Sequence, residues 1–75
     1  MKITVSAGPW ASRYMKSDPI ELDLPDGSTV ADALGALPVP LGEIGIVAIN
    51  GKAVAREMAL VCADCLKIYP VIIGG

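Results

Sequence analysis

With 75 residues the chain has room for one domain, and because it contains no phenylalanine, its core must be built from Val, Ile, Leu and Ala. The net charge is −2 and the six basic residues are scattered, which argues against nucleic acid binding, while the absence of histidine removes the commonest general base and metal ligand. No apolar run approaches the roughly 18 residues that cross a bilayer, and the N-terminal segment reads as a strand rather than a signal peptide, so we expect a cytoplasmic protein with no membrane contact, no metal site and no catalysis of its own.

Two alternating segments predict the first strands. Residues 2–7 and residues 20–24 each alternate apolar with polar side chains, which is the period of a half-buried strand. Residues 8–19 lie between them, begin with Gly-Pro and end with Asp-Pro, and therefore form a long hairpin connection. Trp10 and Tyr14 in this connection either cover the open end of the sheet or form an exposed interface, and we favour packing.

A short helix is predicted within residues 25–37. Thr29 is followed three residues later by Asp32, an approximate capping box in which Asp replaces the usual Glu. Pro38 ends the helix because a proline has no amide hydrogen to continue it. The apolar residues on one face of this helix pack on the sheet: Val30, Ala33, Leu34 and Leu37.

The second half of the chain begins with a loop at residues 39–45. Residues 46–50 are too apolar for a strand with one buried face, and we expect a central strand. Asn50-Gly51 is the strongest hairpin signal in the chain, because both turn positions require positive φ. Residues 52–57 then return as a short edge strand.

The last strand is predicted at residues 66–72, after a turn region at 58–65. Leu66 and Ile68 point inward, whereas Lys67 and Tyr69 point outward. Pro70 has no amide donor, so the hydrogen-bond ladder should weaken there and the chain should leave the sheet.

Cys62 and Cys65 form a CxxC motif in the turn region. Such a pair can be a redox couple or part of a metal site, but a single pair without histidine is half a zinc site. We therefore favour a structural role as two small buried hydrophobic side chains. Asp64 is expected to cap a turn rather than to take part in catalysis. Lys52, Arg56 and Glu57 are either contacts to a charged partner or an ordinary solvated edge.

The order of these elements resembles the ubiquitin-like β-grasp fold, and specifically the small sulfur carriers of molybdopterin and thiamine biosynthesis. The likeness lies in "LPDGSTVADAL" (24–34), "IVAINGKAV" (46–54), Asp64 before "LKIYP" (66–70), and "GG" at 74–75. It implies an α+β fold: a mixed sheet of four to five strands packed on one main helix, with a flexible C-terminal Gly-Gly tail. Residues 1–75 would be a single domain, with a folded body at 1–70 and a projecting tail at 71–75.

Features of both groups of carriers are present. "IYPVIIGG" is similar to the molybdopterin synthase small subunit, in which a proline precedes the final residues, and this is the role we favour. "VARE" (54–57) is similar to a Val-Pro-Arg segment of thiamine carriers, with Ala55 in place of the proline. Both groups usually carry Asp-Gly-Asp before the last strand, where this chain has Cys62-Ala63-Asp64 and so puts alanine in place of glycine.

The resemblance implies that a partner enzyme of the ubiquitin-activating type adenylates the Gly75 carboxylate with ATP, and that a sulfur donor converts the adenylate into a thiocarboxylate. Gly74 and Gly75 then keep any Cβ away from the reacting carbon. The sulfur would pass to a pterin precursor in a complex with a larger synthase subunit, or to thiamine synthesis through a thiazole synthase. No cofactor would be bound stably, because ATP and sulfur donor are used through the partner enzyme.

The residues expected to bind these partners are Tyr69, Pro70, Val71, Ile72 and Ile73. Ordering four tail residues costs about 4–8 kcal/mol, and burying two isoleucines returns roughly 3–6 kcal/mol, so we expect a tail that is mobile in isolation and docks reversibly. Three other interpretations stay open: a ubiquitin-like modifier that forms isopeptide bonds, a β-grasp interaction module without terminal chemistry, and a glycine pair that is merely a frayed end.

Overall fold

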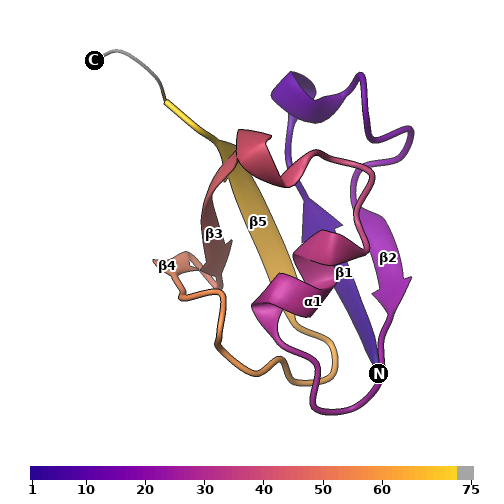
Figure 1. The fold of residues 1–75 in the computed structure, drawn as a ribbon. Helices are drawn as coiled ribbons and strands as arrows, with labels where there is room; N and C mark the ends of the chain where they lie inside the picture. The colour runs from indigo at the N-terminus through magenta and orange to yellow at the C-terminus, as the bar shows by residue number, and fades with distance from the viewer. Residues whose placement is uncertain (73–75) are drawn as a thin grey trace.

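The computed structural model describes residues 1–72, and these form an α+β fold in which a short helix covers one face of a five-stranded mixed sheet (Figure 1). In chain order the elements are β1 (Lys2–Ser6), η1 (Pro9–Ala11), β2 (Ile20–Asp23), α1 (Val30–Gly35), η2 (Leu41–Glu43), β3 (Ile44–Ile49), β4 (Lys52–Ala53) and β5 (Cys65–Pro70), where η marks a single turn of 3-10 helix. The predicted β-grasp architecture is confirmed for the described residues.

The strands follow the order β2-β1-β5-β3-β4 across the sheet. β1 and β5 are parallel, with Val5 opposite Leu66, and the remaining neighbours are antiparallel. The last strand in sequence is therefore the middle strand of the sheet (Figure 1). β1 pairs only with the first residues of β5, up to Lys67, whereas β3 pairs with it up to Pro70, so β3 holds the end of β5 at the point where the chain leaves the sheet.

The N-terminal hairpin follows the alternation of its sequence. Ile3 and Val5 of β1 are fully buried, whereas Ile20 and Leu22 of β2 are only half-buried because β2 is an edge strand. In the long connection, Trp10 lies partly buried against the core, as does Tyr14, which confirms that these aromatic residues pack.

Helix α1 begins with the predicted capping box. The amide of Asp32 donates to Thr29 Oγ1 at 3.3 Å, and the amide of Thr29 donates to Asp32 Oδ2 at 2.9 Å. The α-helix ends at Gly35, before the expected stop at Pro38. The amides of Ala36 and Leu37 bond to carbonyls three residues earlier, which tightens the last turn into 3-10 geometry.

The strands of the second hairpin differ from expectation in their bounds. β3 begins at Ile44 instead of residue 46, directly after η2. Asn50 and Gly51 adopt φ of 53° and 80°, which confirms the predicted hairpin turn. β4 is an edge strand, as expected, but it pairs only over Lys52 and Ala53, because residues 54–57 turn away from the sheet.

The turn before β5 corrects one prediction. Cys62 and Cys65 are both exposed, so the expected role as small buried hydrophobic side chains is wrong. Asp64 caps the turn as predicted, since its Oδ2 accepts from the amide of Val61 at 2.9 Å. Ala63, which stands where the resembled families carry glycine, adopts a left-handed φ of 73°.

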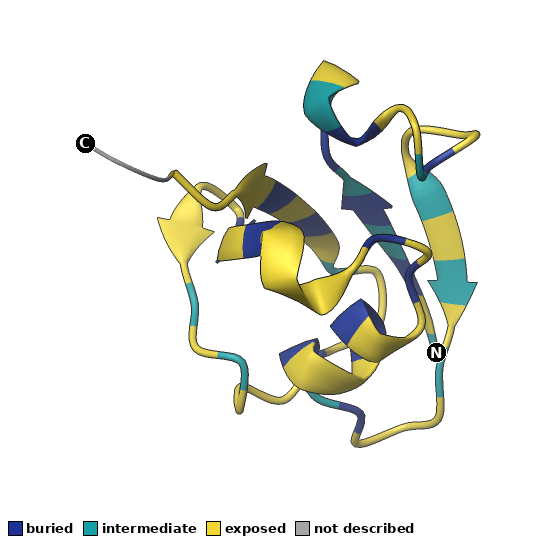
Figure 2. Ribbon diagram, turned by 45° about the horizontal axis from the view of Figure 1, so that its top comes forward, coloured by how far each residue is buried: buried dark blue, intermediate teal, exposed yellow. Residues whose placement is uncertain are grey.

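The hydrophobic core lies between α1 and the sheet (Figure 2). All four apolar residues predicted on the helix face are buried in it, as are both inward residues of β5. The core is aliphatic, as the composition requires; its fully buried large side chains are Ile3, Val5, Val30, Leu34 and Ile68. Within residues 1–72, no helix combines the length and the apolar character needed to cross a membrane.

Candidate functional site at the C-terminal end of β5

The residues predicted to bind partners lie where the chain leaves the middle of the sheet. Tyr69 and Pro70 end β5, and Val71 and Ile72 follow it as the last described residues. The predictions for Ile73, Gly74 and Gly75 fall outside the described residues. We call Pro70, Val71 and Ile72 the tail root.

The tail root is fastened to the loop before β3. Pro70 is the register partner of Ile44, and the amide of Val71 donates to the carbonyl of Glu43 at 3.0 Å. The ladder therefore extends one residue past the proline that was expected to weaken it. Ile72, the last described residue, is 89% exposed.

Gly45 allows this close approach. A Cβ on Gly45 would lie 2.8 Å from the carbonyl oxygen of Pro70 and 3.1 Å from Cα of Val71, and these are backbone atoms that cannot rotate away. Gly45 is also the extra residue of a β-bulge between Ile44 and Ile46. The sequence prediction missed it by treating residues 39–45 as loop, although a glycine within a strand is a recognised sign of a bulge or a close backbone contact.

Arg56 satisfies carbonyl groups at the bulge. Its Nη2 donates to the carbonyl of Ile44 at 2.9 Å and to that of Gly45 at 3.1 Å. A bulge disrupts the ladder locally and leaves backbone groups without strand partners, and a guanidinium can serve two of them at once. Arg56 therefore makes contacts within the chain on the strand that anchors the tail root.

Tyr14 links the long hairpin connection to the same loop. Its phenol donates a hydrogen bond to a carboxylate oxygen of Glu43, and the guanidinium of Arg13 lies 5.3 Å from the centre of the Tyr14 ring. The bond to Glu43 is the main reason that the pKa of Tyr14 is raised. Glu43 thus joins two segments, through its side chain to Tyr14 and through its carbonyl to the tail root.

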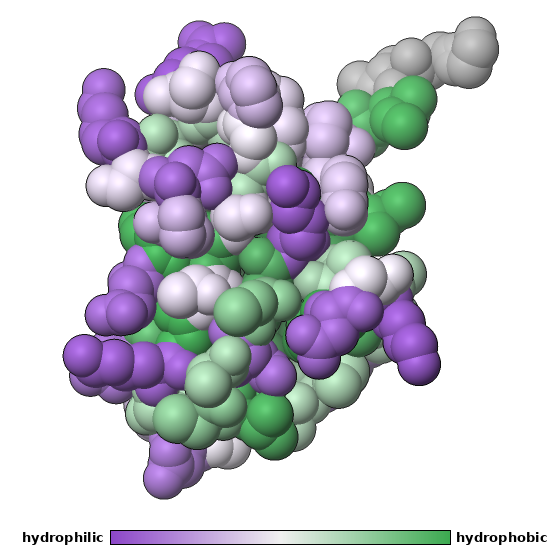
Figure 3. Space-filling model, turned by 180° about the vertical axis from the view of Figure 1, so that it is seen from behind, coloured by the Kyte–Doolittle hydropathy of each residue, from purple (hydrophilic) through white to green (hydrophobic). Residues whose placement is uncertain are grey.

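A patch of apolar side chains surrounds the point where the chain leaves the sheet. We define the exit patch as Ile46, Tyr69, Val71 and Ile72, which are exposed by 55%, 44%, 42% and 89%. Ile46 and Tyr69 are register partners, so their side chains lie next to each other on the sheet face opposite α1. Figure 3 shows the molecule from that side: hydrophilic residues are spread over the surface, and hydrophobic residues are exposed between them and at the right edge of the view. Ile46 was not among the residues predicted to bind partners.

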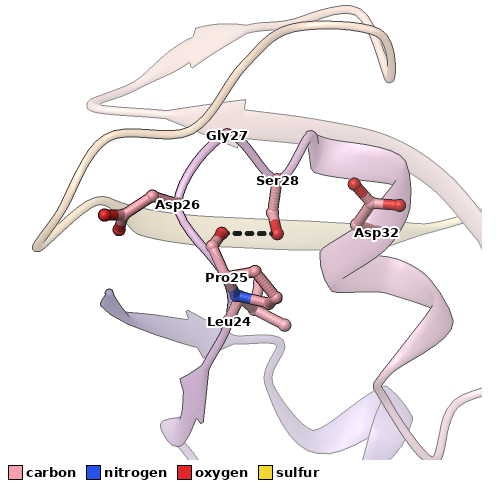
Figure 4. Close-up of a pocket in the computed structure, with 6 residues that line it drawn as sticks. All are labelled: Leu24, Pro25, Asp26, Gly27, Ser28 and Asp32. Atoms are coloured by element: carbon pink, nitrogen blue, oxygen red, sulfur yellow. Dashed lines mark hydrogen bonds between the residues drawn. The ribbon is translucent and has the colours of Figure 1, made fainter.

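A hollow that borders the loop before α1 offers no comparable site. It measures about 440 Å³ and is lined by Leu24, Pro25, Asp26, Gly27, Ser28 and Asp32 (Figure 4). Its polar groups are used within the chain, since the hydroxyl of Ser28 donates to the Pro25 carbonyl at 2.7 Å and Asp32 caps the helix. Within residues 1–72, no three His, Cys, Asp or Glu residues are grouped so as to hold a metal ion.

The arrangement at the end of β5 is suited to presenting an extended segment of chain to a partner. A backbone hydrogen bond, a bulge and an arginine fix where the chain leaves the sheet, and exposed aliphatic side chains give a partner about 1.5–3 kcal/mol per residue on burial.

Comparisons with known proteins support the ubiquitin-like fold. A family model described as Mut7-C ubiquitin matches residues 11–73. Two structures of small archaeal modifier protein 1 from Haloferax volcanii superpose with a TM-score of 0.78 each: one is 24% identical and covers 100% of both chains, and the other is 22% identical and covers 95% of this chain and 98% of that one. No curated protein matches the chain.

A candidate molybdopterin converting factor subunit 1 from Pyrococcus furiosus superposes with a TM-score of 0.80 at 20% identity, over 96% of this chain and 99% of that one. At these identities the likeness establishes the fold, and it confirms the β-grasp resemblance that the sequence indicated.

Proposed function

The chain belongs to the Mut7-C ubiquitin family, and on that premise we propose that it is a sulfur carrier whose reactive group is the carboxylate of Gly75. The observation that carries the proposal is the anchored exit of β5. The Val71–Glu43 bond and the bulge at Gly45 direct the chain out of the sheet beside the exit patch, and only Ile73 separates the described residues from Gly74-Gly75.

The chemistry proposed for Gly75 needs an activated acyl group, because a carboxylate is a poor electrophile. A carboxylate oxygen attacks the α-phosphorus of ATP, and pyrophosphate leaves. A persulfide sulfur of the donor then attacks the carbonyl carbon and displaces AMP, and a thiol reductant cleaves the resulting S–S bond to leave the thiocarboxylate. The glycine pair lets the backbone enter a narrow activating site without a Cβ beside the reacting carbon.

The partners follow from this chemistry. An adenylating enzyme of the ubiquitin-activating type would hold the ATP, and a larger synthase subunit would take up the sulfur for molybdopterin formation. The fold likeness to the Pyrococcus furiosus protein, whose name describes a subunit of a molybdopterin converting factor, supports this choice over thiamine synthesis. The exit patch gives both partners an apolar contact next to the reactive end.

Reconstitution tests the proposal. The chain is incubated with ATP, an activating enzyme and a sulfur donor, and is then weighed intact under denaturing, reducing conditions. We expect one oxygen atom to be replaced by sulfur, and we expect no change when Gly74 and Gly75 are deleted. A Cys62→Ser/Cys65→Ser variant should react as the wild type does, because the sulfur is held at Gly75 and not on a thiol. An unchanged mass in the wild type, with ATP turned over, would contradict the proposal.

A ubiquitin-like modifier is the second candidate, because the chain shares its fold with a protein named small archaeal modifier protein 1. In that case the activated Gly75 would form an isopeptide bond with a lysine of a target. Conjugates of higher mass would persist under reducing and denaturing conditions and disappear when Gly74 and Gly75 are deleted. The absence of such conjugates together with thiocarboxylate formation favours the carrier.

A further inference from the structure

Two exposed thiols lie at the other end of β5. Cys62 and Cys65 are both free and exposed, although free cysteines are among the residue types most often buried. Neither side chain belongs to the core, and neither lies at the tail root. The proposed sulfur carrier function therefore leaves this pair without a role.

The backbone that carries the pair is fixed on both sides. The amide of Ala63 donates to the carbonyl of Lys2 at 2.8 Å, and the amide of Thr4 donates to the carbonyl of Asp64 at 3.0 Å. Within the turn, the amide of Asp64 bonds to the carbonyl of Val61 at 3.1 Å. The turn from Val61 to Asp64 is thus attached to β1, which restrains the backbone that carries both cysteines.

Both cysteines open onto one hollow. It measures about 240 Å³ and lies on the sheet face opposite α1, where its lining also includes Lys2, Thr4 and Glu21. A hollow of this size admits a small molecule that bears a sulfur atom, and the ammonium of Lys2 and the carboxylate of Glu21 supply charges of both signs at its wall. A metal ion fits the hollow less well, because structural zinc takes four ligands and, among residues 1–72, no group of three is present.

We propose that Cys62 and Cys65 are a thiol–disulfide exchange site that is oxidised by small disulfides of the glutathione type. One cysteine thiolate attacks a sulfur of the small disulfide, forms a mixed disulfide and releases a thiolate that takes up a proton. The second cysteine attacks the protein sulfur of that mixed disulfide, closes the Cys62–Cys65 bond and releases the second small thiol. The protein loses two protons and two electrons, and the small disulfide takes them up and is reduced to two thiols.

This site is separate from the end of the chain that carries the proposed sulfur chemistry. Cys65 begins β5 and Pro70 ends it, so the strand places them roughly 17 Å apart at about 3.3 Å per residue. Oxidation of the pair would alter the surface of the sheet near β1 and leave the bulge and the tail root unchanged. Thiol–disulfide exchange at Cys62 and Cys65 does not depend on whether Gly75 accepts sulfur.

Equilibration with oxidised and reduced glutathione, followed by acid quenching and intact mass measurement, tests the inference on the wild-type protein. We expect a species lighter by two hydrogens with no glutathione attached, and its return to the dithiol on addition of dithiothreitol. Cys62→Ser and Cys65→Ser should each stop at a mixed disulfide with one glutathione, because the second thiol is missing.

Repeating the glutathione equilibration in urea, where the chain is unfolded, shows whether the fold positions the two thiols for closure of the disulfide. Because the restrained turn places both cysteines at one hollow, the ratio of closed disulfide to mixed disulfide should be roughly ten-fold higher in the folded protein than in the unfolded chain. Accumulation of wild-type protein with one or two glutathiones and no closed disulfide would overturn the proposal. An equal ratio in the folded and unfolded chains would also overturn it.

Discussion

Substitution of Gly45 by alanine tests how the fold presents the end of β5. The added methyl group would lie 2.8 Å from the carbonyl oxygen and 3.1 Å from the carbonyl carbon of Pro70, and 3.1 Å from Cα of Val71. Real Cβ atoms do not come this close to backbone, so β3 and β5 must separate at the bulge. Gly45 does not have a positive φ, and the cost of the substitution is therefore steric alone.

Overpacking of this kind costs about 1–3 kcal/mol. With a denaturant slope of about 1 kcal/mol per molar for a protein of this size, the urea midpoint should fall by roughly 1–3 M. The amide of Val71 should also exchange with solvent faster, because its bond to the Glu43 carbonyl is the contact that the methyl group displaces. Urea unfolding followed by circular dichroism and hydrogen exchange by NMR measure the two effects.

Gly42→Ala is the matched control, since a Cβ at that position has no atom within 4 Å and Gly42 also lies near the start of β3. We expect its urea midpoint to stay within experimental error of the wild type or to rise slightly. If Gly45→Ala and Gly42→Ala unfold at the same midpoint and the Val71 amide exchanges as before, the close approach at the bulge does not fix the tail root, and the reasoning is refuted.

Three further predictions concern the turn, the exit patch and the tyrosine linked to η2. Ala63→Gly should stabilise the protein by about 0.5–1 kcal/mol in urea unfolding, because alanine is strained at a φ of 73°, and a lower midpoint would show that the strain is absent. Ile46→Ala should weaken binding to the activating enzyme about ten-fold. Val61→Ala, at an aliphatic position of similar exposure in the turn before β5, should leave the dissociation constant unchanged, and equal effects of the two substitutions would rule out the exit patch as the contact. The hydrogen bond to Glu43 raises the pKa of Tyr14 above its ordinary value of 10.0, so the phenol's contribution to stability is complete below about pH 10 and is lost as the pH rises through the raised pKa. Subtracting the absorbance titration of Tyr14→Phe from that of the wild type should give a curve with its midpoint above 10, and a midpoint at or below 10 would contradict this prediction.

Local patterns were sufficient to predict most of the fold. Alternation identified β1, β2 and β5, and the Thr29–Asp32 spacing identified the helix start, because each depends on neighbouring residues alone. The Asn50-Gly51 turn was predictable for the same reason. The ends of the elements were predicted less accurately. α1 stops at Gly35 because the amides that follow it adopt 3-10 bonding, which the residue pattern does not indicate.

The site was predictable in outline but not in its anchoring. The sequence placed Tyr69 and Pro70 at the end of the last strand and expected the chain to leave the sheet from about Pro70, and the structure places the end of β5 there; binding of partners by these residues stays a prediction. Ile46 and Gly45 were missed because their roles depend on pairing with β5; the register partner of Ile46 is Tyr69, 23 residues further along the chain (69 − 46). The exposure of Cys62 and Cys65 was missed because the turn that displays them is attached to β1, a contact between distant segments.

The mass of the C-terminal peptide tests the central claim most directly. The protein is produced together with its activating enzyme and sulfur donor, digested after lysine, and the peptide that begins at Ile68 is weighed and fragmented. The account predicts a population in which one carboxylate oxygen of Gly75 is replaced by sulfur, with every preceding residue unmodified. A peptide that carries only an ordinary carboxylate under conditions where the enzyme consumes ATP would contradict it.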